Sequence, residues 1–292
     1  TLTGSGGSQY LWNPGGFTTA SITVSPALTT AYTLQVTDAN GCQNTDQATV
    51  VVNPVPVANA GTDQEICLGE ATTLFASGGA TYSWTPGNAN TSNFNVNPNS
   101  TTTYDVLVIN SFGCRDNDQV TVTVHPIPVA AFANSGAVCQ FNDVTFTDNS
   151  SVGTGSLASW SWDFGNNVSS SSQNPVVPYN APGTYTVSLI IASAAGCRDT
   201  ISHPINIWAK PVAVSSHTDV CFGNPVNFSN TSSISDATPL AYSWDLGDNT
   251  LSSGASPSHQ YASYGNYQAT LLVTSVHGCT DEVNRSVNVF AL

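Results

Sequence analysis

The sequence of 292 residues has no methionine and very little positive charge, with 4 Lys and Arg against 18 Asp and Glu. Charged residues make up 8%, where an ordinary soluble domain has about 25%. Nucleic-acid partners require a basic surface, so we expect none here. The longest apolar stretch, 187–195, includes two serines and falls short of the roughly 20 residues that span a bilayer as a helix. We therefore also expect no insertion into a membrane.

Ser, Thr, Asn and Gly replace the missing charge, and this composition favours strands and turns over helices. Apolar and polar residues alternate in the segments 104–108, 120–124 and 185–189. A period of two is typical of strands that bury one face. Clusters of turn residues such as Asp38-Ala39-Asn40-Gly41 separate the strands. The sequence therefore predicts an all-β protein built of β-sandwiches.

Four landmarks recur along the chain and divide it into repeats. They are a Trp (12, 84, 162, 244), a Tyr (32, 104, 185, 267), a Gly-Cys pair (Cys42, Cys114, Cys197, Cys279) and a proline-bearing segment such as V-N-P-V-P-V-A. We predict four Ig-like domains at residues 1–54, 55–127, 128–210 and 211–292. Proline stiffens a short connection, so we expect the four domains to form an elongated rod. We expect Trp208 and Phe290, at matching positions of the last two repeats, to pack at joints between domains.

Seven cysteines are distributed as one in the first repeat and two in each later repeat. No C-x-x-C motif or Cys/His cluster suggests zinc, so we predict disulfides and an oxidising compartment. The expected bridges lie within repeats: Cys67–Cys114, Cys139–Cys197 and Cys221–Cys279. Cys42 is expected to be unpaired, because the position that corresponds to Cys67 would precede Thr1. We therefore expect the first domain to be truncated at its N-terminus.

The last two repeats carry a more specific pattern. Trp244-Asp245-Leu246-Gly247-Asp248 is followed by His259-Gln260-Tyr261 and by Gly265-Asn266-Tyr267, and Trp162-Asp163-Phe164-Gly165-Asn166 precedes a similar segment. This pattern resembles the PKD (polycystic kidney disease) domain. The first two repeats have Trp12-Asn13-Pro14-Gly15 and Trp84-Thr85-Pro86-Gly87 instead. They resemble the Ig-like repeats that accompany PKD domains in large surface adhesins of gliding, type IX-secreting Bacteroidota.

The physical roles of the motif residues can be argued from their types. The Trp should pack across the sandwich, where one ring buries a large area. The Asp and Gly after it suit a sharp turn, because Asp accepts bonds from nearby backbone NH groups and Gly takes positive φ. The later Tyr should tie its hydroxyl to the backbone, as in a tyrosine corner.

Residues with catalytic chemistry are few and scattered. There is no G-x-S-x-G motif, and none of the five histidines lies in a catalytic pattern. We expect no enzyme activity and no cofactor. Asp245, Asp248 and Asn249 are candidate calcium ligands because some PKD domains of secreted enzymes bind calcium, with solvated turns as the alternative. Thr200, in Asp199-Thr200-Ile201, resembles a Bacteroidota O-glycosylation sequence.

We interpret the chain as a non-catalytic extracellular array that spaces or presents a functional part of a larger surface or secreted protein. Its expected partners are neighbouring domains of that protein, with glycans, cell surfaces or copies of itself as further candidates. Two alternatives remain at this point. The array is an accessory part of a secreted enzyme that degrades polysaccharide or protein, or it is the subunit of an extracellular filament in which a donated strand completes the first repeat.

Overall fold

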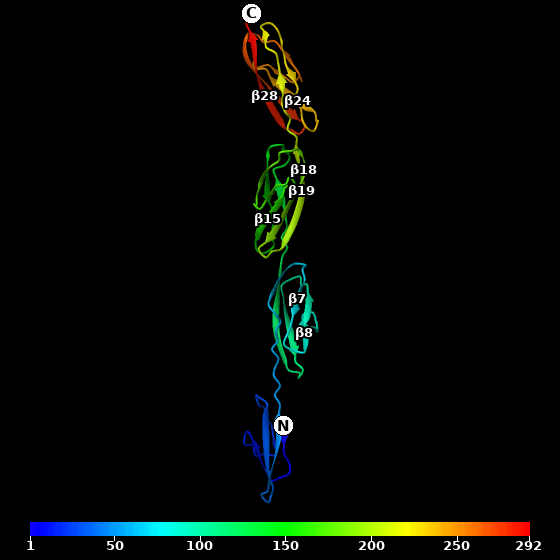
Figure 1. Ribbon diagram of the computed structural model, residues 1–292, viewed down its shortest axis with the longest axis vertical. Coiled ribbons are helices and arrows are strands. Elements are labelled where there is room, and N and C mark those ends of the chain that lie inside the picture. The colour runs from blue at the N-terminus through cyan, green and yellow to red at the C-terminus, as the bar shows by residue number, and fades with distance from the viewer. The chain divides into compact units, whose positions relative to one another are not determined.

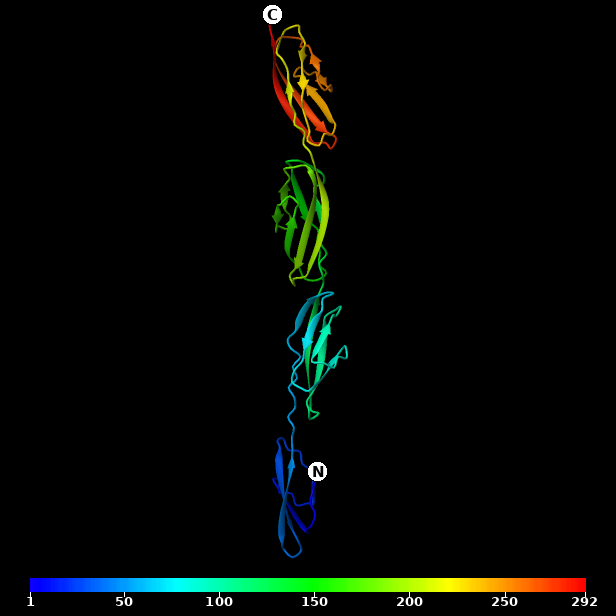
Figure 2. The same cartoon turned by 45° about the vertical axis from the view of Figure 1, so that its right-hand side comes forward.

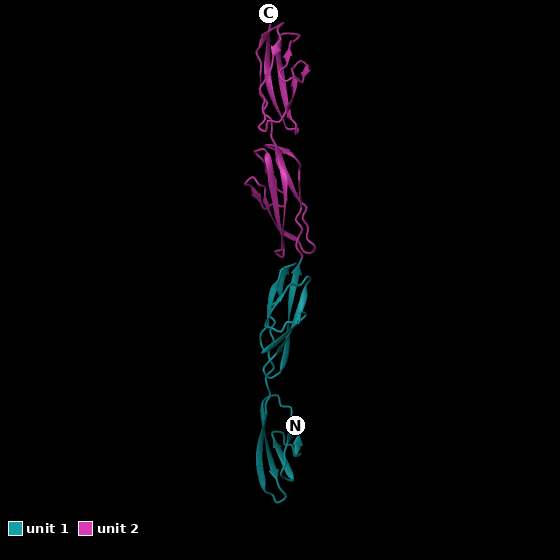
Figure 3. Cartoon of the chain, turned by 90° about the vertical axis from the view of Figure 1, so that its right-hand side faces the viewer, with its two compact units in different colours: residues 1–125 teal, residues 126–292 magenta.

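The computed structural model describes residues 1–292, and its regular structure consists of strands alone (Figure 1). The chain divides into two compact units, residues 1–125 and 126–292 (Figure 3). No helix suitable for crossing a bilayer occurs in it. The expectation of an all-β fold is confirmed.

The first compact unit contains the first two sequence repeats. Its strands are β1 (Leu2–Thr3), β2 (Gln9–Asn13), β3 (Ser21–Ile22), β4 (Thr30–Thr37), β5 (Gln43–Val50), β6 (Gln64–Cys67), β7 (Thr72–Phe75), β8 (Thr81–Thr85), β9 (Asn93–Val96), β10 (Thr102–Ile109) and β11 (Arg115–His125). In the first repeat a β2-β4-β5 sheet accompanies the β1-β3 pair. In the second repeat the order is β6-β11-β10-β8, with a separate β7-β9 pair.

The second compact unit contains the third and fourth repeats. The strands of the third repeat are β12 (Phe132–Asn134), β13 (Val138–Cys139), β14 (Asp143–Asp148), β15 (Leu157–Asp163), β16 (Ser169–Ser170), β17 (Val176–Pro178), β18 (Gly183–Ser193) and β19 (Arg198–Trp208). Those of the fourth are β20 (Ser215–Ser216), β21 (Val220–Cys221), β22 (Val226–Asn227), β23 (Ser229–Asn230), β24 (Leu240–Asp245), β25 (Leu251–Ser252), β26 (Ser258–His259), β27 (Gly265–Ser275) and β28 (Thr280–Phe290). Their larger sheets have one plan, β13-β19-β18-β15-β16 and β21-β28-β27-β24-β25.

The strands of each repeat form two layers (Figure 2). A buried tryptophan lies in the hydrophobic core of every repeat. Trp84, Trp162 and Trp244 are at most 1% exposed. Each indole Nε1 donates to a backbone carbonyl farther along the chain, as from Trp162 to Ser172 at 2.9 Å. The ring is thus buried without leaving its polar atom unsatisfied. Its predicted role in the core is confirmed.

The last long strand of each later repeat has 11 residues and spans the whole sandwich. A short early strand pairs in parallel with its final residues only. The facing pairs at that end are Cys67 and His125, Cys139 and Trp208, and Cys221 and Phe290. We call this end of a repeat its exit end, because the chain leaves the repeat there.

An aspartate at the start of the last strand holds the segment that leads into each later repeat. The backbone NH of Ala60 donates to Asp118 at 2.9 Å, and that of Ala213 donates to Asp281 at 2.9 Å. The bond from the Ala60 NH is the main cause that lowers the pKa of Asp118. For Asp281, burial acts to raise the pKa, but the bonds from Ala213 and Lys210 outweigh it and the pKa is lowered. The carboxylates therefore fix the first segment of the repeat to its last strand.

The turn after the core tryptophan has the predicted form in the last two repeats. The backbone NH of Gly247 donates to the Asp245 carboxylate at 2.9 Å, and Gly165 donates to Asp163 at the same distance. Gly247 has φ of +84°, a region that disfavours side chains. A β-carbon there would lie 2.6 Å from the Gln268 carbonyl oxygen. The turn thus requires glycine both for its φ and for close backbone approach.

The predicted bond from the tyrosine hydroxyl to the backbone is confirmed in the third and fourth repeats. The hydroxyl of Tyr185 donates to the Ala181 carbonyl at 2.9 Å, and that of Tyr267 donates to the Ser263 carbonyl at 2.8 Å. Each of these two repeats has a second, buried tyrosine: Tyr179 donates to the carbonyl of Phe164 at 3.0 Å, and Tyr261 donates to the carbonyl of Leu246 at 2.8 Å. Burial is the main cause that raises the pKa of Tyr261 to about 12. It stays protonated and keeps the turn anchored.

We expect Gly247→Ala to destabilise the fourth repeat by about 1–3 kcal/mol, because the new side chain is strained and meets backbone. Calorimetry of the whole chain should show one transition lowered by roughly 5–15 °C. Gly254→Ala is the matched control, since a β-carbon there meets only the Ser252 hydroxyl at 3.6 Å. Equal effects of the two variants would contradict this account of the turn.

We expect acid to release the segments that the aspartates hold. The folded-state pKa of Asp281 is below its unfolded value of about 3.9, so its contribution is present above that pH and is lost as the pH falls through the folded value. Asp281→Asn should lower stability by about 1–2 kcal/mol at pH 7 and by much less near pH 2. The control is Glu282→Gln on the exposed face of the same strand. A pH-independent loss on Asp281→Asn, measured by thermal unfolding, would contradict the linkage.

Candidate functional site

The two cysteines of each later repeat lie at opposite ends of the sandwich. Cys139 is at the exit end of the third repeat, facing Trp208 at the end of β19, whereas Cys197 directly precedes the first residue of β19. Eleven residues of strand, at about 3.3 Å each, separate those ends by roughly 35 Å. A disulfide needs α-carbons within about 7 Å. The predicted bridges within repeats are therefore geometrically impossible in this fold.

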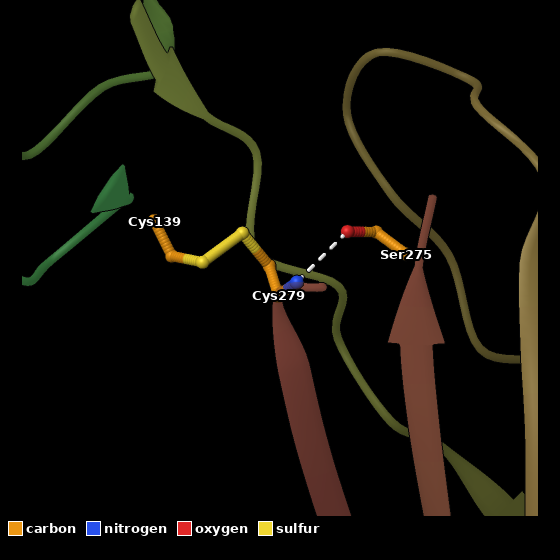
Figure 4. The surroundings of a disulfide bond; sticks show 3 residues. All are labelled: Cys139, Ser275 and Cys279. Atoms are coloured by element: carbon orange, nitrogen blue, oxygen red, sulfur yellow. Dashed lines mark hydrogen bonds between the residues drawn. A yellow bond between two sulfur atoms is a disulfide. The ribbon is translucent and has the colours of Figure 1, made fainter. Parts of the chain in front are cut away.

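The structure corrects all three predicted pairings. Cys139 is bonded to Cys279 of the next repeat, with α-carbons 5.7 Å apart (Figure 4). Cys67 and Cys197 are also disulfide-bonded residues. Cys114 and Cys221, which were expected to be bridged, are free thiols, as is the exposed Cys42. Each later repeat has one cysteine at each end of its sandwich. The Cys139–Cys279 bridge therefore crosses the joint between two repeats instead of closing one sandwich.

Cys279 reaches the joint on a tight turn that we call the Gly-Cys turn, residues 275–279. The NH of Ser275 donates to the carbonyl of Cys279 at 2.8 Å, and the NH of Gly278 donates to the carbonyl of Ser275 at 3.0 Å. The NH of Cys279 also donates to the Ser275 hydroxyl at 3.1 Å (Figure 4). Gly278 has φ of +80°, which its lack of a side chain permits. The turn therefore presents the Cys279 sulfur in a fixed direction.

Trp208 and His277 stack face to face beside the bridge. Their ring centroids are 3.6 Å apart and the planes differ by 9°. The predicted packing of Trp208 at a joint is confirmed. Its histidine partner was missed, because the sequence placed His277 only in a cysteine turn. The signal that could have found it is the His-Gly-Cys order, which puts a ring two residues before a bridging cysteine.

Polar contacts complete the joint. The Lys210 ammonium lies 3.2 Å from the Asp281 carboxylate, which also accepts from the Ala213 NH. This ion pair is partly exposed and contributes at most about 1 kcal/mol. The contact mainly fixes the path of the chain, because Asp281 binds both Lys210, before Pro211, and Ala213, after it. The joint between the third and fourth repeats is thus joined by backbone, disulfide, stacked rings and a shared carboxylate.

The calcium candidates are engaged with protein donors. Asp245 accepts from the Gly247 NH, and Asp248 lies 2.7 Å from Nε2 of His259 and accepts from the Thr250 NH. Burial acts to raise the pKa of Asp248, but these hydrogen bonds from His259 and Thr250 outweigh it and lower the pKa. Asn249 takes positive φ in the same turn. The arrangement provides a structural Asp–His pair that links the turn to β26.

The remaining candidates are dispersed. Thr200 lies exposed in β19, facing Ile190 of β18, so its hydroxyl is accessible to modification. No group of three or more His, Cys, Asp and Glu side chains is placed to hold a metal ion. The first repeat has a groove of about 710 Å³, lined among others by Trp12, Leu34 and Val36. Its sheet also lacks a counterpart of β6, so β5 is an unpaired edge.

Comparison with known proteins assigns the second compact unit to a family. A model of the PKD domain matches residues 125–207 and 208–290. The chain is 27% identical over 183 residues to pre-pro-metalloprotease PrtV of Vibrio cholerae, which covers 62% of the chain. The chain spans only 19% of that relative's length.

Two solved structures are similar over about one repeat. The PKD1 domain of Vibrio anguillarum Epp is 31% identical, covering 29% of this chain and 96% of its own, with a TM-score of 0.27. The PKD1 domain of the Vibrio cholerae metalloprotease PrtV is 30% identical, covering 28% and 98%, with a TM-score of 0.26. Since the family model matches more than half of its residues, the chain belongs to the PKD domain family.

Proposed function

We propose that this chain is a non-catalytic extracellular spacer, made of four tandem sandwich domains at residues 1–54, 55–127, 128–210 and 211–292, that holds a functional part of a larger surface protein at a distance. The observation that carries the proposal is the Cys139–Cys279 bridge across the joint. A bond placed there stabilises the relation between two domains rather than either domain alone.

Two separate covalent links restrict a joint far more than one. The backbone connects the domains through the segment from Trp208 to Ala213, and the disulfide connects them at a second point. Bending about the backbone would have to stretch the bridge or break the Trp208–His277 stack. Pro211 further limits the backbone between them. We infer that the joint resists bending and transmits force along the chain.

The chemistry of the bridge supports an extracellular location. Disulfides persist in oxidising compartments and are rare where cellular thiol systems keep cysteines reduced. The low charge and the Ser- and Thr-rich strand faces suit a surface exposed to solvent. Within this proposal the parent is an adhesin of gliding, type IX-secreting Bacteroidota, to whose Ig-like repeats the first two repeats are similar. Its partners would be neighbouring domains of the parent protein.

A second candidate is an accessory array of a secreted degradative enzyme. The match to a pre-pro-metalloprotease favours it, because that relative combines PKD-like sequence with a protease name. The flanking sequence of the parent protein separates the candidates. A catalytic domain beside the array favours the accessory role, whereas many further repeats favour the spacer of an adhesin.

We expect the whole chain to be extended in solution. Each sandwich has strands of roughly 20–35 Å, so four in line should give a maximum dimension on the order of 130–160 Å. Small-angle scattering at several protein concentrations measures this directly. A maximum dimension below about 90 Å would contradict the spacer proposal.

We expect the joint to weaken when its bridge is removed. The bridge closes a loop of 140 residues, which in the chain-entropy model contributes about 5 kcal/mol. The double variant Cys139→Ser with Cys279→Ser should unfold at lower denaturant concentration. It should also be cleaved several-fold faster by chymotrypsin after Trp208.

Cys42→Ser is the matched control, because that thiol is free and exposed. It should leave both measurements unchanged. If the double variant lost stability but its cleavage at Trp208 stayed as slow as in the parent chain, the bridge would stabilise domains without holding the joint, and the proposed role would be wrong.

A further inference from the structure

The exit end of the fourth repeat reproduces the exit end of the third, bond for bond. Cys221 faces Phe290 as Cys139 faces Trp208. The NH after each cysteine donates to the carbonyl of the facing aromatic residue, from Phe222 to Phe290 and from Gln140 to Trp208, both at 2.8 Å. The backbone is therefore set in the same position at both ends.

The two exit ends differ in whether another repeat contacts their cysteine and aromatic ring. At the third repeat the cysteine is bridged and the ring is stacked by His277. At the fourth repeat Cys221 is an exposed thiol, and the Phe290 side chain is 55% exposed. A thiol and an aromatic ring are thus left open together, at the two positions that a following repeat contacts in the one bridged joint of this compact unit.

The complementary part is also a repeated module. Asn110 to Cys114 forms the same Gly-Cys turn, with the NH of Asn110 donating to the carbonyl of Cys114 at 3.0 Å and that of Gly113 to Asn110 at 3.0 Å. The glycine φ values of the turns at Gly41, Gly113, Gly196 and Gly278 lie between +80° and +86°. Any repeat of this kind therefore offers a cysteine in the geometry that Cys279 uses.

We propose that the exit end of the fourth repeat, formed by Cys221 and Phe290, is a docking and disulfide site for the Gly-Cys turn of a further PKD-type domain that follows in line. In the bond-forming step, Cys221 and the incoming cysteine each give up one proton and one electron as the S–S bond forms. An external disulfide accepts two electrons and two protons and leaves as two thiols. Where the incoming turn carries a ring two residues before its cysteine, as Phe112 and His277 do in this chain, that ring stacks on Phe290.

The site deepens the proposed spacer function, because it makes the bridged joint repeatable along a parent chain. It rests, however, on the local geometry of the third and fourth repeats. Its failure would leave the observed Cys139–Cys279 joint, and the spacer role argued from it, unaffected.

The repeat register supplies a direct test. Leu292 corresponds to Lys210, since Trp208 to Phe290 is a shift of 82 positions, so a second copy of residues 211–292 can follow Leu292 without any added linker. In the appended copy alone, Cys221→Ser and Thr280→Ser make its cysteine peptides different in mass from those of the original repeat. This extended chain is oxidised with a mixture of oxidised and reduced glutathione and mapped by non-reducing mass spectrometry. We expect Cys221 to be bonded to the appended copy of Cys279 in most molecules.

The Cys139–Cys279 bridge in the same sample is the internal reference, because its presence shows that the chain has folded and that the redox conditions suffice. If that bridge forms while Cys221 stays a thiol, the proposal is overturned. Bridging of Cys221 to Cys42 of a second molecule of the unextended chain would also contradict it, since the site would then take a separate copy rather than a domain in line.

A variant separates docking from mere proximity of two thiols. Phe290→Ala in the extended chain should slow formation of the new bridge several-fold relative to the internal reference, because the incoming ring loses its stacking surface. Leu251→Ala, which removes an exposed apolar side chain at the opposite edge of the same sheet, should have no effect. Equal rates in the parent and Phe290→Ala chains would show that no docking surface guides the bond.

Discussion

The length of the last strand is the constraint on which the cysteine chemistry depends. Eleven residues of continuous strand separate the Gly-Cys turn from the exit end in each later repeat. The sulfur atoms of one repeat therefore lie too far apart to meet, and only a neighbouring domain can supply a partner within bonding distance. Because the last strand spans the sandwich, the cysteines at its two ends can form disulfides only with neighbouring domains.

The joint gathers contacts of different range around that bond. The Trp208–His277 stack is a short-range apolar contact, the Asp281 carboxylate links the segment before Pro211 to the strand after it, and the disulfide fixes both. Each is placed to oppose relative movement of two sandwiches, which is the property that a spacer needs.

Local patterns predicted local structure well. Alternation in 185–189 gave a strand with Val187 and Leu189 fully buried, and the Trp-Asp-x-Gly pattern gave the turn at Gly247, because each depends on neighbours in sequence. Pairing of the cysteines failed, because it depends on where the two-residue strands β13 and β21 join their sheets. A parallel pairing so short leaves no periodicity in sequence. The stacking of His277 was missed because its partner, Trp208, lies in another repeat, and no local pattern indicates that contact.

Disulfide mapping of the native, non-reduced protein tests the central claim most directly. Proteolysis with the thiols blocked, followed by mass spectrometry, identifies the partner of Cys139. The account predicts a linked peptide pair that contains Cys139 and Cys279. A pair that contains Cys139 and Cys197 would contradict it, because the last strand of the third repeat could not then span the sandwich.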